Sequence, residues 1–202
     1  MTKAIFFDYH GVLDRRTFQG MLRRLAQLIY TQGDFESFLQ VVYSKYALFT
    51  NLYAAGDIMP EHFWSKLTND GLNTIQIQKL QDYILTVETN DLLLPVLEKL
   101  RENGFKLGLL SDSPLDKIAK IRYRWDLEKY FDYVFFSSEQ GLNKIEPDFY
   151  NLMLLGGNYQ PGEIMYIEDN PKLVNMAKSA GFQAVAYTPE MDLIKYFDLK
   201  GD

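Results

Sequence analysis

Cysteine is absent from this chain of 202 residues. Without it the protein has no disulfide bond, no thiolate metal ligand and no cysteine nucleophile. The absence also suits a reducing compartment, because proteins of the cytosol do not depend on disulfides for their stability. We therefore expect a cytoplasmic protein.

Long apolar runs and an excess of basic residues are missing as well. No stretch approaches the roughly 18 apolar residues of a membrane span, and the N-terminal run AIFF is too short for a signal peptide. Acidic residues outnumber basic ones by 27 to 21, which gives a net charge of −6. Because nucleic acid requires a basic surface, we expect neither nucleic acid nor a membrane as a partner.

The apolar residues that are present form short stretches, which alternate with amphipathic ones. Strand length and β-forming residues mark five of these stretches, at 4–7, 106–111, 133–138, 164–168 and 184–187. Helical periodicity marks the segments between them, at 91–104, 113–125 and 170–181, the second with Ser113 as N-cap and Pro114 in its first turn. The alternation predicts an α/β fold with a doubly wound, Rossmann-like parallel sheet. Such a sheet binds its ligand outside the carboxyl ends of its strands.

One segment departs from this alternation and shows helical periodicity alone. It covers residues 15–89 and is called the helical insertion below. We expect two domains: an α/β core formed by 1–14 and 90–202, and a small all-helical cap formed by 15–89. The insertion follows the first strand directly, so a cap there would lie over the strand ends. Alternatively, its many aromatic residues simply build a small helical core.

Polar side chains gather where the predicted strands end. These side chains are Asp8, Ser111, Asp112, Lys144, Glu168 and Asp169. Any one of them, Asp112 above all, can be explained as a turn former. In a parallel sheet, however, all of these ends meet at one edge, and carboxylates crowded together there repel one another unless a cation joins them. Carboxylate oxygens suit Mg²⁺, and a lysine beside a helix start suits a phosphate group.

The same residues carry a resemblance to the haloacid dehalogenase superfamily of hydrolases. FFDYHGVLD is similar to the first motif of that family, LLSDSP to its second, GLNKIEPDFY to its lysine motif and MYIEDNPKLVNMAKSAGF to its acidic motif. The motifs occur in the family's order over nearly the whole chain. The resemblance is to the branch with a helical cap inserted after the first strand.

The resemblance implies a Mg²⁺ site. Asp8 and Asp169 would be its main ligands, with Glu168 assisting directly or through water and the backbone carbonyl of His10 completing the protein's share. Asp8 would also be the nucleophile, whose carboxylate attacks phosphorus and forms an aspartyl-phosphate.

The resemblance also implies a phosphate site. Ser111 would hydrogen-bond a transferring oxygen, and Asp112 would lie beside it in the substrate site. Lys144 would neutralise the phosphoryl group and hold Asp8 ionised. In the family this lysine is more often followed directly by proline, whereas here Pro147 lies three positions on, which leaves the reach of Lys144 open.

His10 is the main departure from the family. Phosphatases of the family have a second aspartate at this position, which protonates the leaving oxygen and then takes a proton from water. Histidine can in principle make both transfers, but an adjacent Mg²⁺ would favour its neutral form, which donates poorly. The alternative is that His10 merely caps the turn or packs under the insertion.

Three functions remain open. The first is a Mg²⁺-dependent phosphatase acting on a small phosphate ester, and the second is a hydrolytic 2-haloacid dehalogenase, which uses the same nucleophile without metal. The third is a phosphate-binding or regulatory module with weak catalysis. Tyr9, Phe18 and Arg15, near the start of the insertion, are the candidate substrate contacts, while the substrate and the oligomeric state cannot be read from the sequence.

Overall fold

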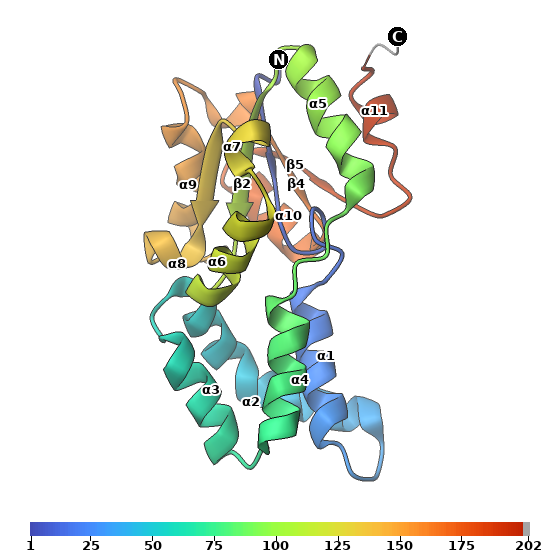
Figure 1. The fold of residues 1–202 in the computed structure, drawn as a ribbon. Coiled ribbons are helices and arrows are strands. Elements are labelled where there is room, and N and C mark those ends of the chain that lie inside the picture. The colour runs from blue at the N-terminus through green and yellow to red at the C-terminus, as the bar shows by residue number, and fades with distance from the viewer. Residues whose placement is uncertain (200–202) are drawn as a thin grey trace.

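The computed structural model describes residues 1–199, apart from the side chains of residues 18 and 19. The chain forms a sheet covered by helices, and the helical insertion projects from one end of it (Figure 1). Among the residues described, no helix is both long and apolar enough to span a membrane.

The sheet has five strands, all parallel, in the order β3-β2-β1-β4-β5. The strands are β1 (Ala4–Phe7), β2 (Lys106–Ser111), β3 (Tyr133–Phe136), β4 (Ile164–Glu168) and β5 (Gln183–Ala186). Phe7 lies opposite Leu109 on one side and Ile167 on the other, so the ends of the three central strands are in register. The predicted parallel sheet is confirmed.

Helices pack on both faces of this sheet, as a doubly wound fold requires (Figure 1). One face carries α5 (Leu94–Glu102), α6 (Leu115–Arg124) and α11 (Leu193–Tyr196), and the other carries α9 (Pro147–Leu155) and α10 (Pro171–Ser179). The core strands are apolar throughout because both of their faces are buried. Shorter elements are η1 (Asp91–Leu93), α7 (Leu127–Tyr130), α8 (Ser137–Gln140) and η2 (Pro161–Glu163).

Two predicted element boundaries are wrong at serine residues whose side chains have other partners, and β5 lies one residue earlier than predicted. β3 ends at Phe136 and α8 begins at Ser137, whose hydroxyl bonds to the carbonyl of Ala54 and accepts from the Ser113 amide. Ser113 itself does not cap α6, which has Pro114 as its N-cap residue and no side-chain cap bond. Both serines instead join the junction between the sheet and the helical insertion.

The helical insertion contains four helices. They are α1 (Phe18–Ile29), α2 (Phe35–Ala55), α3 (Pro60–Asn69) and α4 (Thr74–Leu85). Side-chain caps start three of them, with Thr17, Asp34 and Asn73 each accepting from a backbone amide of the first turn. The helices bury a hydrophobic cluster of their own, in which the rings of Tyr53 and Phe63 stack at a centroid distance of 4.0 Å. Most aromatic residues of the insertion therefore serve packing.

Candidate active site

A cavity of about 620 Å³ lies between the carboxyl edge of the sheet and the helical insertion. Asp8, Asp112 and Lys144 line it from the sheet side, as do Glu168 and Asp169. The insertion contributes residues of α1, α2 and α4 to the opposite wall. The topology thus brings five of the six predicted strand-end residues, all except Ser111, to one crevice, where a parallel sheet is expected to bind its ligand.

Lys144 lies at the centre of the polar groups. Its Nζ is 2.5 Å from Asp8 Oδ1 and 2.8 Å from Glu168 Oε2, and all three side chains are almost fully buried. Burial by itself lowers the pKa of Lys144, but the two carboxylates outweigh it and raise that pKa above its usual value. The ammonium group therefore stays charged.

The backbone around Lys144 explains how it reaches the crevice although proline follows three positions later. The Lys144 amide donates to Asp112 Oδ1 at 3.0 Å, which fastens the loop to the end of β2. Pro147 then begins α9 as predicted, and Glu146 accepts from the amide of Asn143 to close the intervening turn. Burial raises the pKa of Asp112 to about 6.

Three carboxylates lie close enough to share a cation. Oxygens of Asp8, Glu168 and Asp169 all lie within 4.8 Å of one another. Gly11 makes room for them, because it has a φ of +80° and a Cβ there would lie 2.2 Å from Asp169 Oδ2. A side chain at Gly11 would therefore displace the Asp169 carboxylate.

The protonation of these carboxyl groups follows from the excess of negative charge. Burial, and then Glu168, raise the pKa of Asp8 well above its usual value and that of Asp169 to about 7. Glu168 is buried too, but Lys144 holds its pKa below the usual value. One ammonium group thus faces three carboxylates, which leaves an excess of negative charge at the site.

Glu168 is held in place on both of its oxygens. Oε2 accepts from Lys144 and, at 2.8 Å, from the Tyr166 hydroxyl, while Oε1 accepts from the Asn170 amide at 3.0 Å. Asp169, which also lines the cavity, is less buried. Glu168 is therefore suited to positioning Lys144, and Asp169 is the more accessible of the two carboxylates.

His10 lies beside a chain of hydroxyl groups. Its Nε2 is 3.3 Å from Ser113 Oγ, which is 3.1 Å from Ser111 Oγ. Burial lowers the pKa of His10 well below its usual value, and the charges of Lys117 and Lys144 add to the effect. Ser111 is completely buried and does not line the cavity, so its predicted contact with a transferring oxygen stays a prediction.

The three candidate substrate contacts receive no support from the structure. Tyr9 is completely buried in the hydrophobic cluster on the α5 face and does not line the cavity. The side chain of Phe18 lies outside the described residues. Arg15 is exposed and does not line the cavity, whereas its neighbour Arg16 does.

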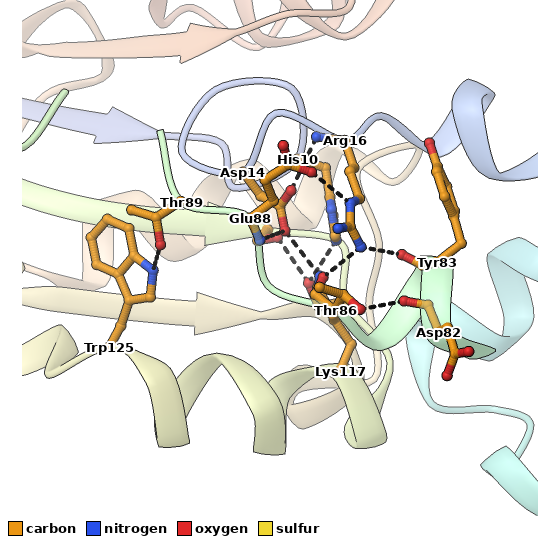
Figure 2. A network of polar contacts seen from close by, with 12 residues as sticks. His10, Asp14, Arg16, Asp82, Tyr83, Thr86, Glu88, Thr89, Lys117 and Trp125 are labelled. Carbon is orange, nitrogen blue, oxygen red and sulfur yellow. Dashed lines mark hydrogen bonds and ion pairs between the residues drawn. The ribbon is translucent and has the colours of Figure 1, made fainter. Parts of the chain in front are cut away.

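A buried ion pair that the sequence analysis missed lies behind His10. Lys117 Nζ of α6 is 3.0 Å from Asp14 Oδ2, and the exposed fractions of the two side chains are 1% and 0%. Lys117 also donates to the Thr86 carbonyl at 2.7 Å, and Asp14 accepts from the Glu88 amide at 3.3 Å. The pair thereby joins α6 to both chain segments that connect the insertion to the sheet (Figure 2).

Arg16 extends this network toward the insertion. It donates to the Glu88 carboxylate at 3.1 Å and to the carbonyls of Tyr83 and Thr86 (Figure 2). Its own amide bonds to Asp14 at 3.0 Å. The guanidinium group is therefore occupied by protein acceptors although it lines the cavity.

The residue before Lys117 makes a second junction. Asp116 accepts from the Tyr53 hydroxyl at 2.6 Å and from the Trp64 indole at 3.2 Å, on α2 and α3. Two consecutive residues of α6 thus hold the insertion at two separate places.

Comparison with known proteins decides the family. A model of the haloacid dehalogenase-like hydrolases matches residues 2–181. The chain belongs to this family. A phosphorylated carbohydrates phosphatase from Thermotoga maritima is 34% identical over 89 residues, which are 44% of this chain and 41% of that relative, so the match spans less than half of either protein.

Solved structures of the family share the fold. A haloacid dehalogenase family enzyme from Bacteroides thetaiotaomicron in a magnesium complex superposes with a TM-score of 0.76 at 20% identity, covering 97% of this chain and 98% of that one. A predicted hydrolase of the same family from Porphyromonas gingivalis gives a TM-score of 0.74 at 22% identity, covering 98% and 97%. The predicted family is confirmed, as is the predicted α/β fold with its parallel sheet.

Proposed function

We propose that the protein is a Mg²⁺-dependent phosphomonoesterase that acts on a small phosphate ester through an aspartyl-phosphate at Asp8. The observation that carries the proposal is the close grouping of Asp8 with Lys144 and with two further carboxylates in one cavity. A nucleophilic carboxylate, an ammonium group for the phosphoryl oxygens and a cation site are the parts that phosphoryl transfer requires.

The residues present fit a magnesium ion. Three carboxylates with a single buried ammonium group carry excess negative charge, which a divalent cation would balance. Asp8 and Asp169 would hold the ion, with Glu168 and the backbone carbonyl of His10 beside them. Bound there, Mg²⁺ would neutralise phosphoryl charge and favour the ionised form of Asp8.

The first chemical step belongs to Asp8. Its carboxylate oxygen forms a bond to phosphorus, and the bond between phosphorus and the ester oxygen breaks, so that the leaving group departs as an alkoxide that takes up a proton. In the second step a water molecule attacks the same phosphorus, the bond to Asp8 breaks, and inorganic phosphate leaves. Lys144, within bonding distance of Asp8, stabilises the charge of the phosphoryl oxygens in both steps.

In this proposal His10, which lines the cavity, transfers the protons of both steps, and it accepts a proton more readily than it donates one. A neutral imidazole accepts a proton from the attacking water more readily than it donates one to an alkoxide. Burial and two nearby ammonium groups keep His10 neutral. We therefore expect faster turnover of esters with good leaving groups than of sugar or alkyl phosphates.

The helical insertion acts in this proposal as a cap domain over the active site. It closes the side of the cavity that faces the strand ends and is held there by Lys117 and Asp116. The core would comprise 1–14 and 90–202, and the cap 15–89. The name of the Thermotoga relative, which refers to phosphorylated carbohydrates, supports a small phosphate ester as substrate.

A panel of phosphate esters assayed with Mg²⁺ and with a chelator tests the proposal. We expect phosphate release that needs Mg²⁺ and is lost in Asp8→Asn, while the variant retains the wild-type fold. Release of halide from a 2-haloacid in the presence of chelator would instead select the dehalogenase. Mg²⁺-dependent binding of an ester without product release would select the binding module.

A further inference from the structure

The wall of the cavity opposite Asp8 is formed largely by one face of α2. Gln40, Tyr43, Ala47, Thr50 and Asn51 line it, at spacings of three, four and seven residues that place them on one side of the helix. None of these side chains carries a charge. The face is therefore a neutral surface with polar groups, and it lines the same cavity as Asp8.

Two polar groups of this face, Asn51 and Gln40, have no hydrogen-bond partner among the residues that the structure describes. Thr50 uses its hydroxyl to donate to the Tyr46 carbonyl at 2.6 Å. Within residues 1–199, by contrast, neither of the two amide side chains forms a hydrogen bond to the protein. An amide that lines a cavity in this way can both donate to and accept from a ligand hydroxyl.

The two amides lie at different depths. The C-terminal end of α2 meets the sheet domain, where the Ala54 carbonyl bonds to Ser137 and the Tyr53 hydroxyl bonds to Asp116. Asn51 lies within one turn of this junction and is half-buried, whereas Gln40 lies about 16 Å further along the helix axis, at 1.5 Å per residue, and is exposed. Asn51 is thus the amide nearer to the reacting groups.

Most of the positively charged side chains that line the cavity are already paired with protein groups, so they attract a second anionic group of a substrate only weakly. Lys144 is paired with Asp8 and Glu168, and Lys117 is paired with Asp14. Arg16 is bound to the Glu88 carboxylate and to two backbone carbonyls. Of the lysines and arginines that line the described cavity, this leaves only Lys172, which is exposed on the sheet side.

We infer that Asn51 determines substrate specificity by hydrogen-bonding hydroxyl groups of an uncharged leaving group. The inference rests on the proposed phosphatase activity and adds to it the residue that selects the ester. It also defines the substrate class as monophosphates of neutral, hydroxyl-bearing compounds, as opposed to bisphosphates or phosphorylated acids.

Steady-state kinetics of Asn51→Ala with three probes tests this inference. p-Nitrophenyl phosphate has no hydroxyl on its leaving group, glucose 6-phosphate has several, and glucose 1,6-bisphosphate adds a second anion. We expect the KM of glucose 6-phosphate, or its inhibition constant against p-nitrophenyl phosphate, to rise about 3- to 10-fold, as loss of one neutral hydrogen bond implies. The KM of p-nitrophenyl phosphate should stay within about twofold.

Two further variants make the result specific. Asn51→Ser keeps a hydrogen-bonding group and should recover part of the loss, which a purely structural role would not produce. Ser44→Ala, on the exposed side of the same helix, should match the wild type with all probes.

Each other outcome has a defined meaning. The inference alone is overturned if Asn51→Ala changes the KM of p-nitrophenyl phosphate and that of glucose 6-phosphate equally. It is also overturned if Gln40→Ala raises the KM of glucose 6-phosphate more than Asn51→Ala does, or if the wild type binds glucose 1,6-bisphosphate more tightly than glucose 6-phosphate. No turnover of any probe with Mg²⁺ overturns the proposed function.

Discussion

Lys144 Nζ lies 2.5 Å from Asp8 Oδ1, in a position where neither side chain is appreciably exposed. The contact joins the end of the first strand to a loop that follows the third. Both partners also lie close to Glu168 at the end of β4. Lys144 forms an ion pair with it, whereas the negative charge of Glu168 repels that of Asp8. The candidate chemistry therefore depends on a buried cluster in which no charge is independent of the others.

Replacing Lys144 by methionine removes the cation of this cluster. We expect a fall in kcat of about 10²- to 10³-fold, because a preorganised charge on the transferring group is lost. Lys120→Met, which removes an exposed lysine of α6, is the matched control and should match the wild type. A Lys144→Met enzyme with unchanged kcat would show that the lysine does not act on the phosphoryl group.

Magnesium should stabilise the protein more at high pH than at low pH. The pKa of Asp169 is raised to about 7 and that of Asp8 is raised as well, so these two groups bind more protons in the metal-free folded protein than in the unfolded chain. Their contribution to stability is then highest in acid and falls as the pH rises toward 7, since folding takes up these protons. Magnesium competes with the same protons and reverses the trend.

Thermal unfolding with Mg²⁺ and with chelator, at pH 5.5 and pH 8, measures this effect. At pH 8 and a Mg²⁺ concentration about 100 times Kd, we expect a rise in Tm of about 5–10 °C. At pH 5.5 the rise should be smaller. Asp169→Asn should abolish the difference, and an equal rise at both pH values in the wild type would contradict the assignment.

His10→Asp should change the preference among leaving groups. Aspartic acid can donate a proton to an alkoxide, whereas the neutral histidine donates poorly. We expect kcat for glucose 6-phosphate to rise by about 10²-fold relative to kcat for p-nitrophenyl phosphate. His10→Asn, which cannot transfer a proton, is the control. Equal changes for both substrates would mean that His10 has only a structural role.

The Asp14–Lys117 pair should stabilise the junction of the insertion. Lys117→Met leaves the Asp14 carboxylate buried without its partner. We expect this to lower the free energy of unfolding by about 3–5 kcal/mol. The double variant Asp14→Asn, Lys117→Met should recover part of this loss, because no unpaired charge remains. Urea titration measures both values, and a Lys117→Met loss under about 1 kcal/mol would contradict the role of the pair.

Much of the sheet could be predicted from the sequence because its strands are uninterrupted apolar runs. β1 and β2 begin and end at the predicted residues, as does β4. The strand-end residues could be placed together because parallel strands open at one edge. The short β3 was predicted two residues too long, since Ser137 is taken up by contacts to the insertion, and β5 lies one residue earlier than predicted.

The burial of Tyr9 could have been predicted from the alternation of residues in the first strand. Side chains alternate along a strand, and Ile5, Phe7 and Tyr9 all lie in the same buried cluster. Asp8 and His10, the residues before and after Tyr9, line the cavity instead. The alternation alone would have placed Tyr9 in the core and not against the substrate.

Lys117 and Asp116 illustrate what the sequence could not provide. In an amphipathic helix such as SPLDKIAKIRYRW, a lysine or an aspartate is expected on the solvated face. Here both are covered by the insertion, whose position depends on packing between segments about 60 to 100 residues apart. A pattern within one helix carries no information about such a partner.

Trapping of the covalent intermediate tests the central claim most directly. The protein is mixed with Mg²⁺ and excess p-nitrophenyl phosphate, quenched in acid within the first turnovers, digested and analysed by mass spectrometry. We predict one phosphoryl group on the peptide that carries Asp8, removed by hydroxylamine and missing from Asp8→Asn. Phosphate release at the wild-type rate with no phosphoryl group on Asp8, or continued turnover in Asp8→Asn, would contradict the account.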